Sequence, residues 1–290
     1  MTMSSVVTAP VAAVRVPARS LAGELRAIKI VWQRDLIRFA EDRMRMVIML
    51  VQPFIFLFVL GTGFQALTSR STGGVDIRTF MFPGIVAMSL LFTSIFSAAS
   101  IVWDREFGFL REMLVAPVWR GSIVIGKCLG GSTVAVLQGV LVVAVAGLVG
   151  VPYSPAMIIG VIALQLLLAF TLTSLGLMIA VRIKQIQSFM AINQMLVLPL
   201  YFTSGALFPV SHLPAWLAVL NRFDPLTYAI APIRHVVFAS LTISPAARQI
   251  LDPGIMWGSW TVPTWLDAAI VFAIGVTVLA IAIIRFSRDD

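Results

Sequence analysis

Charged side chains are scarce in this sequence of 290 residues. Asp, Glu, Lys and Arg make up 12% of it, whereas 59% of the residues are hydrophobic, and a soluble domain has about 25% charged residues. This composition excludes an ordinary soluble domain and indicates an integral membrane protein. The net charge of +8 could suit nucleic-acid binding, but the basic residues lie at the edges of apolar runs and not on one water-exposed face. We therefore expect no nucleic-acid partner.

Cysteine and histidine, the usual metal ligands and nucleophile partners, are almost missing. The single cysteine, Cys128, excludes a disulfide within the chain and a cysteine-based metal cluster. His212 and His235 have no neighbouring ligands at metal spacing, and the sequence has no Ser/His/Asp arrangement and no paired carboxylates within an apolar run. We expect no metal site and no catalytic residue, which disfavours an intramembrane enzyme. If the protein uses a source of energy, we expect that source to lie in another protein.

One stretch nearly matches a phosphate-binding loop. Residues 121–128 read GSIVIGKC, but Cys128 lacks the hydroxyl that would ligate magnesium, and the preceding residues are predicted to be a helix where the motif needs a strand. The sequence therefore predicts no nucleotide site here. Instead, Lys127 is expected to snorkel to the membrane interface, and Gly126 and Gly130 to form a packing face of small residues.

Six apolar runs are long enough to cross a bilayer as helices, which takes about 20 residues each. They are apolar continuously and do not alternate, which favours helices over a β-barrel. Their approximate ranges are 46–66, 80–103, 123–149, 155–181, 188–209 and 266–284. We predict an all-α integral membrane fold with a six-span domain over residues 46–290.

The basic residues predict the orientation. Sixteen of the 21 Lys and Arg residues fall on one side of the predicted spans and five on the other, so the first side is expected to be cytoplasmic. Both termini then lie in the cytoplasm. Residues 1–20 lack an apolar core preceded by positive charge, so we expect no cleaved signal peptide. Arg outnumbers Lys by 18 to 3, which favours a bacterium with a GC-rich genome and hence a bacterial plasma membrane.

Two segments outside the spans have helical patterns. Residues 20–45, after a flexible stretch over 1–19, are predicted to form an amphipathic interfacial helix, as a membrane anchor, a partner contact or both. Its apolar arc contains Leu21, Leu25, Ile28, Trp32, Leu36 and Phe39. The outer segment 210–264 is too apolar for a free loop, and we expect short re-entrant helices there.

The stretch between the second and third spans is more charged than a simple connection requires. Residues 104–120 are predicted to form a short cytoplasmic helix that ends at Pro117. One side of it is apolar, with Phe107, Phe109, Leu110, Met113 and Leu114, and the other carries Asp104, Arg105, Arg111 and Glu112. Gly108 is expected to permit close approach. Such a helix, held between two spans, is suited to receive a push from a soluble partner.

These motifs resemble the type-2 ABC exporter permeases, the family that includes drug-resistance and polysaccharide-export permeases. DREFGFLREMLVAPVWRGSIVIGK at 104–127 is similar to that family's coupling helix. DPLTYAIAPIRH at 224–235 is similar to its signature before the last span, with Pro225, Leu226, Tyr228 and Arg234 at the matching positions. The preceding segment, from Met195 to Leu217, is similar to the family's fifth span and its exit.

The resemblance implies a dimer of permease subunits, a homodimer or a heterodimer, with two ABC ATPase subunits beneath it. ATP and magnesium would bind in those ATPases, and this chain would hold no cofactor. The residues implied for ATPase coupling are Asp104, Arg105, Glu106, Phe107, Leu110, Arg111 and Glu112.

The resemblance also implies a substrate path between the two subunits and an outer exit gate. Candidate path residues are aromatic or amide side chains, which suit an amphipathic organic molecule: Gln52, Phe54, Phe58, Phe92, Phe96 and Gln194. Candidate gate residues are Arg222, Asp224, Tyr228 and Arg234. The version REMLVAPV of the coupling helix is most similar to drug and antibiotic exporters, including daunorubicin-resistance permeases. A polysaccharide or lipid-linked glycan exporter remains an alternative, and a passive channel or an assembly subunit is the alternative of another class.

Overall fold

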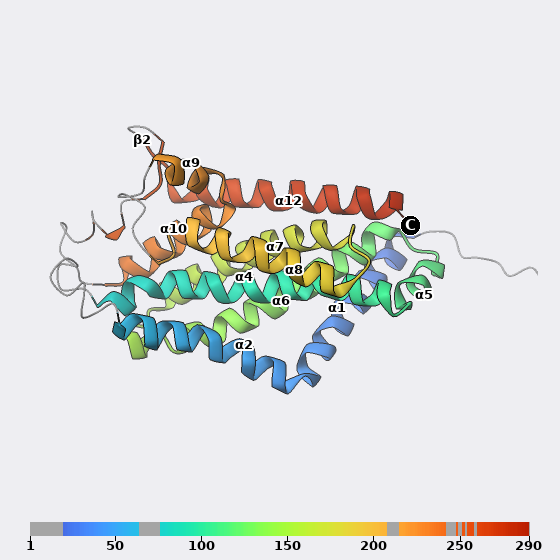
Figure 1. Cartoon of the computed structure of the whole chain (residues 1–290), viewed down its shortest axis with the longest axis horizontal. Helices are drawn as coiled ribbons and strands as arrows, with labels where there is room; N and C mark the ends of the chain where they lie inside the picture. The colour runs from blue at the N-terminus through green and yellow to red at the C-terminus, as the bar shows by residue number, and fades with distance from the viewer. Residues whose placement is uncertain are drawn as a thin grey trace, which may run out of the picture.

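The computed structural model describes residues 20–63, 76–207, 215–241, 248, 251–252, 254–257 and 260–289. The expected loop residues 64–75, much of the outer segment and the stretch 1–19 lie outside these ranges. The described chain is almost entirely helical, and its long helices run side by side along the molecule (Figure 1). This arrangement agrees with the predicted all-α membrane fold.

Five helices are long and apolar enough to cross a membrane: Met46–Gly63, Ile77–Glu106, Arg120–Val143, Pro155–Ala180 and Thr264–Arg288. They correspond to the predicted first, second, third, fourth and sixth spans. In element labels they are α2 (Arg43–Ile55) with η1 (Phe56–Leu60), then α4 (Ile77–Glu106), α6 (Arg120–Val143), α7 (Pro155–Ala180) and α12 (Thr264–Asp289). Helix α4 is the most buried of them, and α2 and α12 are the most exposed.

The predicted fifth span corresponds to α8 (Ile186–Thr203), which has 18 residues. At 1.5 Å per residue it is about 27 Å long, slightly shorter than the hydrocarbon core. The amides of Asn193 and Gln194 interrupt its apolar run, and Pro199 lies inside it. It is not one of the five helices that length and composition identify as spans. Helix α8 packs against α4 and α10.

The first span changes its winding near its middle. Helix α2 contains Pro53 and continues as a π-helical turn from Phe56 to Leu60. Proline lacks a backbone N–H and cannot make the hydrogen bond to the preceding turn. A local π-helical turn is a common adjustment within an α-helix.

The segment between the second and third spans is divided into two helical pieces, which differs from the single predicted helix. Helix α4 continues through Glu106, the chain turns at Gly108, and α5 runs only from Phe109 to Val115. Gly108 has φ +84°, and no atom lies within 4 Å of the place a Cβ would take. Glycine is therefore favoured at position 108 because the backbone there is left-handed. It is not needed for the close approach of another element, which we had expected.

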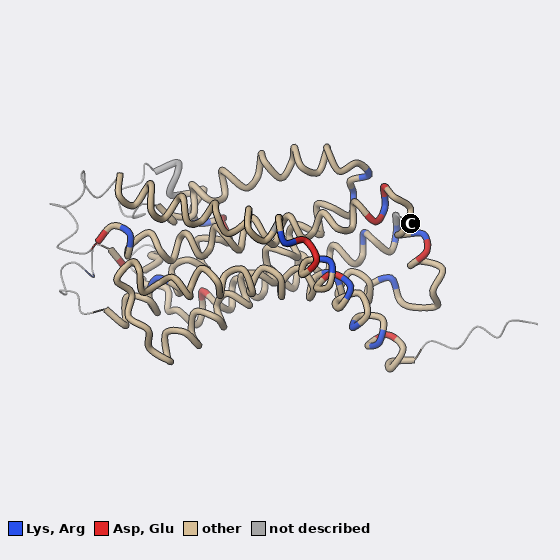
Figure 2. Tube along the Cα trace, turned by 90° about the horizontal axis from the view of Figure 1, so that it is seen from below, with Lys and Arg blue, Asp and Glu red and all other residues tan. Residues whose placement is uncertain are grey.

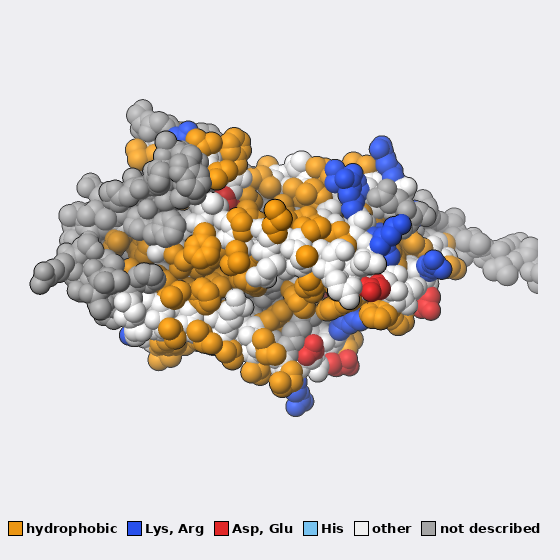
Figure 3. All heavy atoms as spheres, viewed as in Figure 1, with side chains coloured by type: hydrophobic (Ala, Val, Ile, Leu, Met, Phe, Trp, Pro, Cys, Tyr) orange, Lys and Arg blue, Asp and Glu red, His pale blue; other side chains and the backbone are white. Residues whose placement is uncertain are grey.

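Charged residues gather toward one end of the bundle (Figure 2). This end, here called the charged end, contains α1 (Leu21–Glu41), α5, the turn at residues 181–185 and the C-terminal end of α12. In the view of Figure 3, the surface toward the middle of the molecule shows hydrophobic patches among other uncharged atoms and very few charged side chains. This pattern is typical of a bundle whose central zone contacts lipid.

The opposite end is built from shorter elements. Helices α9 (Ala215–Phe223) and α10 (Pro225–Ala239) follow each other with Asp224 between them, and α10 packs against α12, α7 and α4. Two short antiparallel strands, β1 (Met256–Trp257) and β2 (Trp260–Thr261), precede α12. The sequence did not predict these strands. A 3₁₀ turn, η2 (Ala146–Val149), follows α6 at this end.

Candidate functional site

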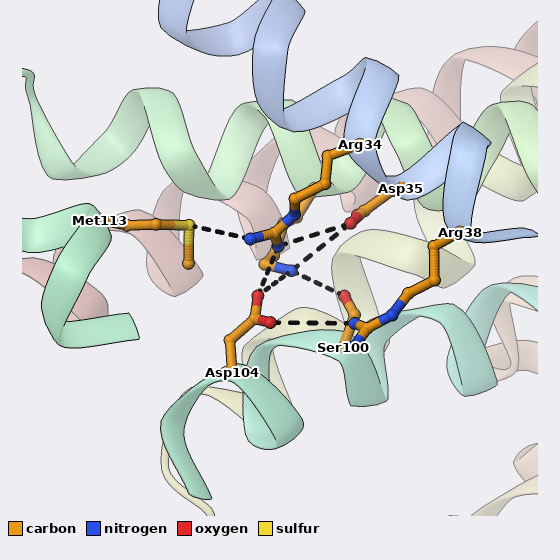
Figure 4. A network of polar contacts seen from close by, with 7 residues as sticks. Arg34, Asp35, Arg38, Ser100, Asp104 and Met113 are labelled. Carbon is orange, nitrogen blue, oxygen red and sulfur yellow. Dashed lines mark hydrogen bonds and ion pairs between the residues drawn. The ribbon is translucent and has the colours of Figure 1, made fainter. Parts of the chain in front are cut away.

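A buried ion network joins α1, α4 and α6 at the charged end (Figure 4). The Nζ of Lys127 lies 2.7 Å from Oδ2 of Asp104 and donates a hydrogen bond of 3.0 Å to Oγ of Ser100. Arg34 of α1 donates to the same Asp104 oxygen at 2.6 Å. The side chains of Lys127 and Asp104 are 0% and 3% exposed, so this ion pair lies inside the protein, and the partly exposed Arg34 reaches it from the surface.

Further side chains of α1 and α5 complete the network. Asp35 lies 3.7 Å from Lys127, and Arg38 approaches Asp104 at 3.8 Å. Arg34 also contacts the sulfur of Met113 in α5 at 3.4 Å, and the guanidinium of Arg38 stacks on Trp103. Because a buried charge is very costly without a partner, this network fixes α1 against the end of α4.

The backbone of α6 permits this close contact. A Cβ at Gly126 would lie 2.8 Å from Cβ of Val31, and a Cβ at Gly130 would lie 2.9 Å from Cβ of Asp35. The predicted small-residue face is therefore confirmed, and its partner is α1. The prediction that Lys127 snorkels to the interface is wrong, because α1 covers this side chain and Asp104 neutralises it.

A second contact joins α1 to the other end of the 104–120 segment. The carboxylate of Glu24 accepts hydrogen bonds from the backbone N–H of Trp119, at 2.9 and 3.0 Å, and from Oγ of Ser122, at 2.6 Å. Trp119 is the N-cap of α6 and makes no capping bond with its own side chain. Glu24 therefore caps α6 from a neighbouring helix, where a negative charge is favourable. Helix α1 thus holds both the entry and the exit of the segment.

Two charged residues of the segment are bonded to the turn between α7 and α8. Arg105 donates to the carbonyl oxygens of Val181 at 2.6 Å and Ile183 at 3.0 Å. Glu106 accepts from the backbone N–H of Ile186 at 2.9 Å. These bonds satisfy carbonyls after the end of α7 and an amide at the start of α8, groups that helix ends leave unpaired.

The structure divides the seven predicted coupling residues into three groups. Asp104 and Leu110 are buried, and Arg105 and Glu106 bind the α7–α8 turn. Phe107, Arg111 and Glu112 are exposed. With Phe109, at 51% exposed, and Val115, at 85%, they form a mixed apolar and charged surface, which we call the α5 surface. Large exposed apolar side chains beside charges typically mark a protein-contact site.

The predicted path residues lie on α2, η1, α4 and α8 but do not all meet. Gln52 and Phe92 line the same small hollow between α2 and α4. Phe54 stacks on Phe58, and Phe96 packs edge-on against Trp103. Gln194 is exposed on α8. Gln52 also borders a groove of about 310 Å³ on the outside of α2.

The predicted gate residues form a bonded corner between α8, α9 and α10. Asp224 caps α10 through the N–H of Leu226 and accepts from Oγ1 of Thr203. Arg234 is buried, donates to the carbonyl of Gly205 at 2.7 Å and lies over the ring of Phe80. The hydroxyl of Tyr228 donates to the carbonyl of Arg222, whose side chain is exposed. Burial raises the pKa of Asp224 to about 7.

Taken together, the apolar helices and the charged end define a multi-pass helical membrane protein. Residues 26–238 match the model of the ABC-2 type transporter family, which is more than half of the chain, and the chain belongs to that family. It is therefore the membrane permease of an ABC transporter.

Named relatives agree with the family. A Cyanophora paradoxa protein named as a transport permease, ycf38, is 31% identical over 191 residues, which are 64% of this chain and just under two thirds (66%) of that relative. Nodulation protein J of Rhizobium leguminosarum bv. trifolii is 29% identical over 211 residues, 71% of this chain and 79% of its own. The inner membrane transport permease YadH of Escherichia coli is 28% identical over 214 residues, 72% of this chain and 82% of its own.

Proposed function

We propose that this chain is the permease subunit of an ATP-driven exporter in the bacterial plasma membrane. It crosses the membrane six times, with α8 as the short fifth span and both termini in the cytoplasm, so that the charged end is the cytoplasmic end. Two ABC ATPase subunits bind beneath it and hydrolyse ATP, and the chain itself supplies no catalytic residue.

The observation that carries this proposal is the double attachment of α1 to the 104–120 segment. Glu24 holds its exit and Arg34 holds its entry through Asp104, while the α5 surface stays exposed. A push on α5 would therefore reach α4 and α6 directly and α1 through charged contacts. Arg105 and Glu106 extend the same connection to α7 and α8.

The roles of the seven coupling residues follow from their positions. Phe107, Arg111 and Glu112 would touch the ATPase. Asp104, Arg105 and Glu106 would hold the segment in place for that contact, and Leu110 would anchor α5 to the bundle.

The proposed cargo is an amphipathic organic compound, such as a drug or an antibiotic, moving along a face built from α2, α4 and α8. Gln194 is exposed on this face. Polar side chains within a span usually face a water-filled cavity or another helix and not lipid. This supports a second permease copy, identical in the simplest case, that closes the face and encloses the path. The corner at Asp224 and Arg234 would form its outer end.

The first test is capture of the ATPase encoded beside this chain by the purified, tagged permease in nanodiscs. Phe107→Ser and Glu112→Arg change the α5 surface and leave the internal bonds of Asp104, Arg105 and Glu106 in place. Both should lose most of the captured ATPase.

Phe223→Ser is the matched control for Phe107→Ser, because Phe223 is 81% exposed at the other end of the molecule. It should capture as much ATPase as the wild type. If the wild-type chain captures no ATPase, the proposed exporter has no source of energy. The passive-channel or assembly alternative would then replace the exporter.

A further inference from the structure

A hollow of about 800 Å³ opens at the charged end between α5 and the α7–α8 turn. It is lined by four basic side chains and three apolar ones: Arg105, Arg111, Arg182, Lys184, Leu110, Leu114 and Val181. Within the part of the chain that the structure describes, no acidic side chain belongs to this lining. We call this site the basic hollow.

The positive charges are brought together by the fold. Arg105 is fixed by the carbonyls of Val181 and Ile183, so the α4 end and the turn form one wall. Arg182 and Lys184 project from that turn with exposed side chains, and Arg111 comes from α5. The nearest acids in the sequence are engaged or turned outward, since Glu106 binds the N–H of Ile186 and Glu112 is exposed on α5.

Four like charges around one hollow repel each other, and an anion with several oxygens would offset that repulsion. Guanidinium groups bind phosphate oxygens with well-matched geometry. The apolar wall of Leu110, Leu114 and Val181 adds a requirement that a small hydrophilic anion does not meet. The hollow lies where α4 and α7 end and α8 begins, which is the level of lipid head groups for helices that cross a bilayer.

We propose that the basic hollow binds the phosphate head group of an anionic amphiphile from the cytoplasmic leaflet. The proposal rests on the proposed function for the cytoplasmic position of the charged end. The proposal places an anion-binding site at the cytoplasmic ends of α4 and α8, two helices of the proposed path. An anionic amphiphile held there is positioned to act as cargo or as a bound regulatory lipid, and both carry the same chemistry.

The test uses the full chain, purified with its ATPase in a neutral detergent and examined by native mass spectrometry. Phosphatidylglycerol is titrated in, with phosphatidylcholine and inorganic phosphate as separate arms. The wild type should retain phosphatidylglycerol about tenfold more tightly than Arg182→Gln/Lys184→Gln, because that variant removes two of the four positive charges that surround the basic hollow. The two substituted side chains are exposed, so the packing stays intact.

Arg26→Gln/Lys29→Gln is the matched control. It removes one arginine and one lysine that are also exposed, on α1 and outside the hollow. This variant should bind phosphatidylglycerol like the wild type, and phosphatidylcholine should bind weakly to all three proteins.

Three results would overturn the proposal. Equal lipid retention by both double variants would mean that the charge at the hollow has no special role. If inorganic phosphate binds as tightly as phosphatidylglycerol, the hollow recognises phosphate alone and not an amphiphile. Unchanged lipid binding with loss of the ATPase from Arg182→Gln/Lys184→Gln would assign the hollow to the ATPase. By contrast, a complex that keeps its ATPase but binds no lipid leaves the proposed function intact, so the two failures are distinguishable.

Discussion

Lys127 and Asp104 form an ion pair of 2.7 Å between α6 and α4, and both side chains are almost completely removed from solvent. Arg34 and Arg38 of α1 reach the same carboxylate from the other side, and those two arginines are partly exposed. The pair therefore depends on α1: without this helix, Lys127 and Asp104 would be open to their surroundings along the packing face of Gly126 and Gly130.

Lys127→Met should destabilise the protein by about 3 kcal/mol, because it leaves the buried Asp104 carboxylate with only its partly exposed arginine partners. Adding Asp104→Leu should recover part of this loss, since Arg34 and Arg38 can turn toward water once the carboxylate is gone. Thermal unfolding of the detergent-purified chain measures both effects. Lys29→Met, at an exposed position of α1, should leave the melting temperature unchanged. Strictly additive losses in the double variant would contradict a coupled pair.

Glu24→Ala should cost about 1 kcal/mol of stability, the usual value of a lost helix cap, but should reduce coupling more strongly. The bonds of Glu24 to Trp119 and Ser122 are the polar link between α1 and the exit of the segment. The measurement is the ratio of transported compound to ATP hydrolysed in reconstituted vesicles, beside the melting temperature. Glu41→Ala, at the exposed last residue of α1, provides the comparison. If the two variants couple equally well, α1 does not transmit motion through Glu24.

The spans could be predicted from the sequence because continuous apolar runs have few alternatives in a membrane. Residues 79–103, which carry no charged side chain, form most of α4. The helix nevertheless continues through Asp104, Arg105 and Glu106. All three charged side chains form hydrogen bonds or ion pairs with partners in other parts of the protein. Those partners lie from 23 residues away, for Lys127 and Asp104, to 80 residues away, for Ile186 and Glu106, beyond what helical periodicity can detect.

The sequence predicted a charged helical segment at 104–120, but it did not predict which contacts the side chains of that segment make. Leu110 was placed on the apolar side of its helix and is buried, as the pattern indicated. Asp104 was grouped with exposed charges because the sequence does not reveal that Lys127, inside an apolar run, needs an acidic partner. An aspartate within the basic helix 20–45, Asp35, and a lysine within an apolar span were the two available signals. Each is ambiguous until the helices are packed together.

Gly126→Ala should displace α1 and destabilise the protein by about 1–3 kcal/mol, the usual cost of overpacking. The new Cβ would come within 2.8 Å of Val31 and 3.0 Å of the backbone oxygen of Ile28, and a backbone atom cannot move aside cheaply. Gly63→Ala is the control, because nothing lies within 4 Å of its Cβ position. Thermal unfolding compares the two, and protease sensitivity of α1 should rise only in Gly126→Ala. Equal stability of the two variants would contradict the tight α1–α6 contact.

The stability of the outer corner should decrease as the pH rises through about 7. Burial raises the pKa of Asp224 from 3.8 to about 7 in the folded protein, so the folded state binds this proton more tightly than the unfolded chain does. The resulting stabilisation is complete below about pH 4 and is lost as the pH rises to the folded pKa, a change of at most about 4 kcal/mol.

Asp224→Asn keeps an acceptor for the N–H of Leu226 and can donate to Thr203, while it removes the charge. Its melting temperature should therefore vary less between pH 5 and pH 8 than that of the wild type. Asp42→Asn, at an exposed position at the end of α1, should follow the wild-type curve. If the melting temperature changes by the same amount from pH 5 to pH 8 in all three proteins, Asp224 does not titrate in this range and the raised pKa is contradicted.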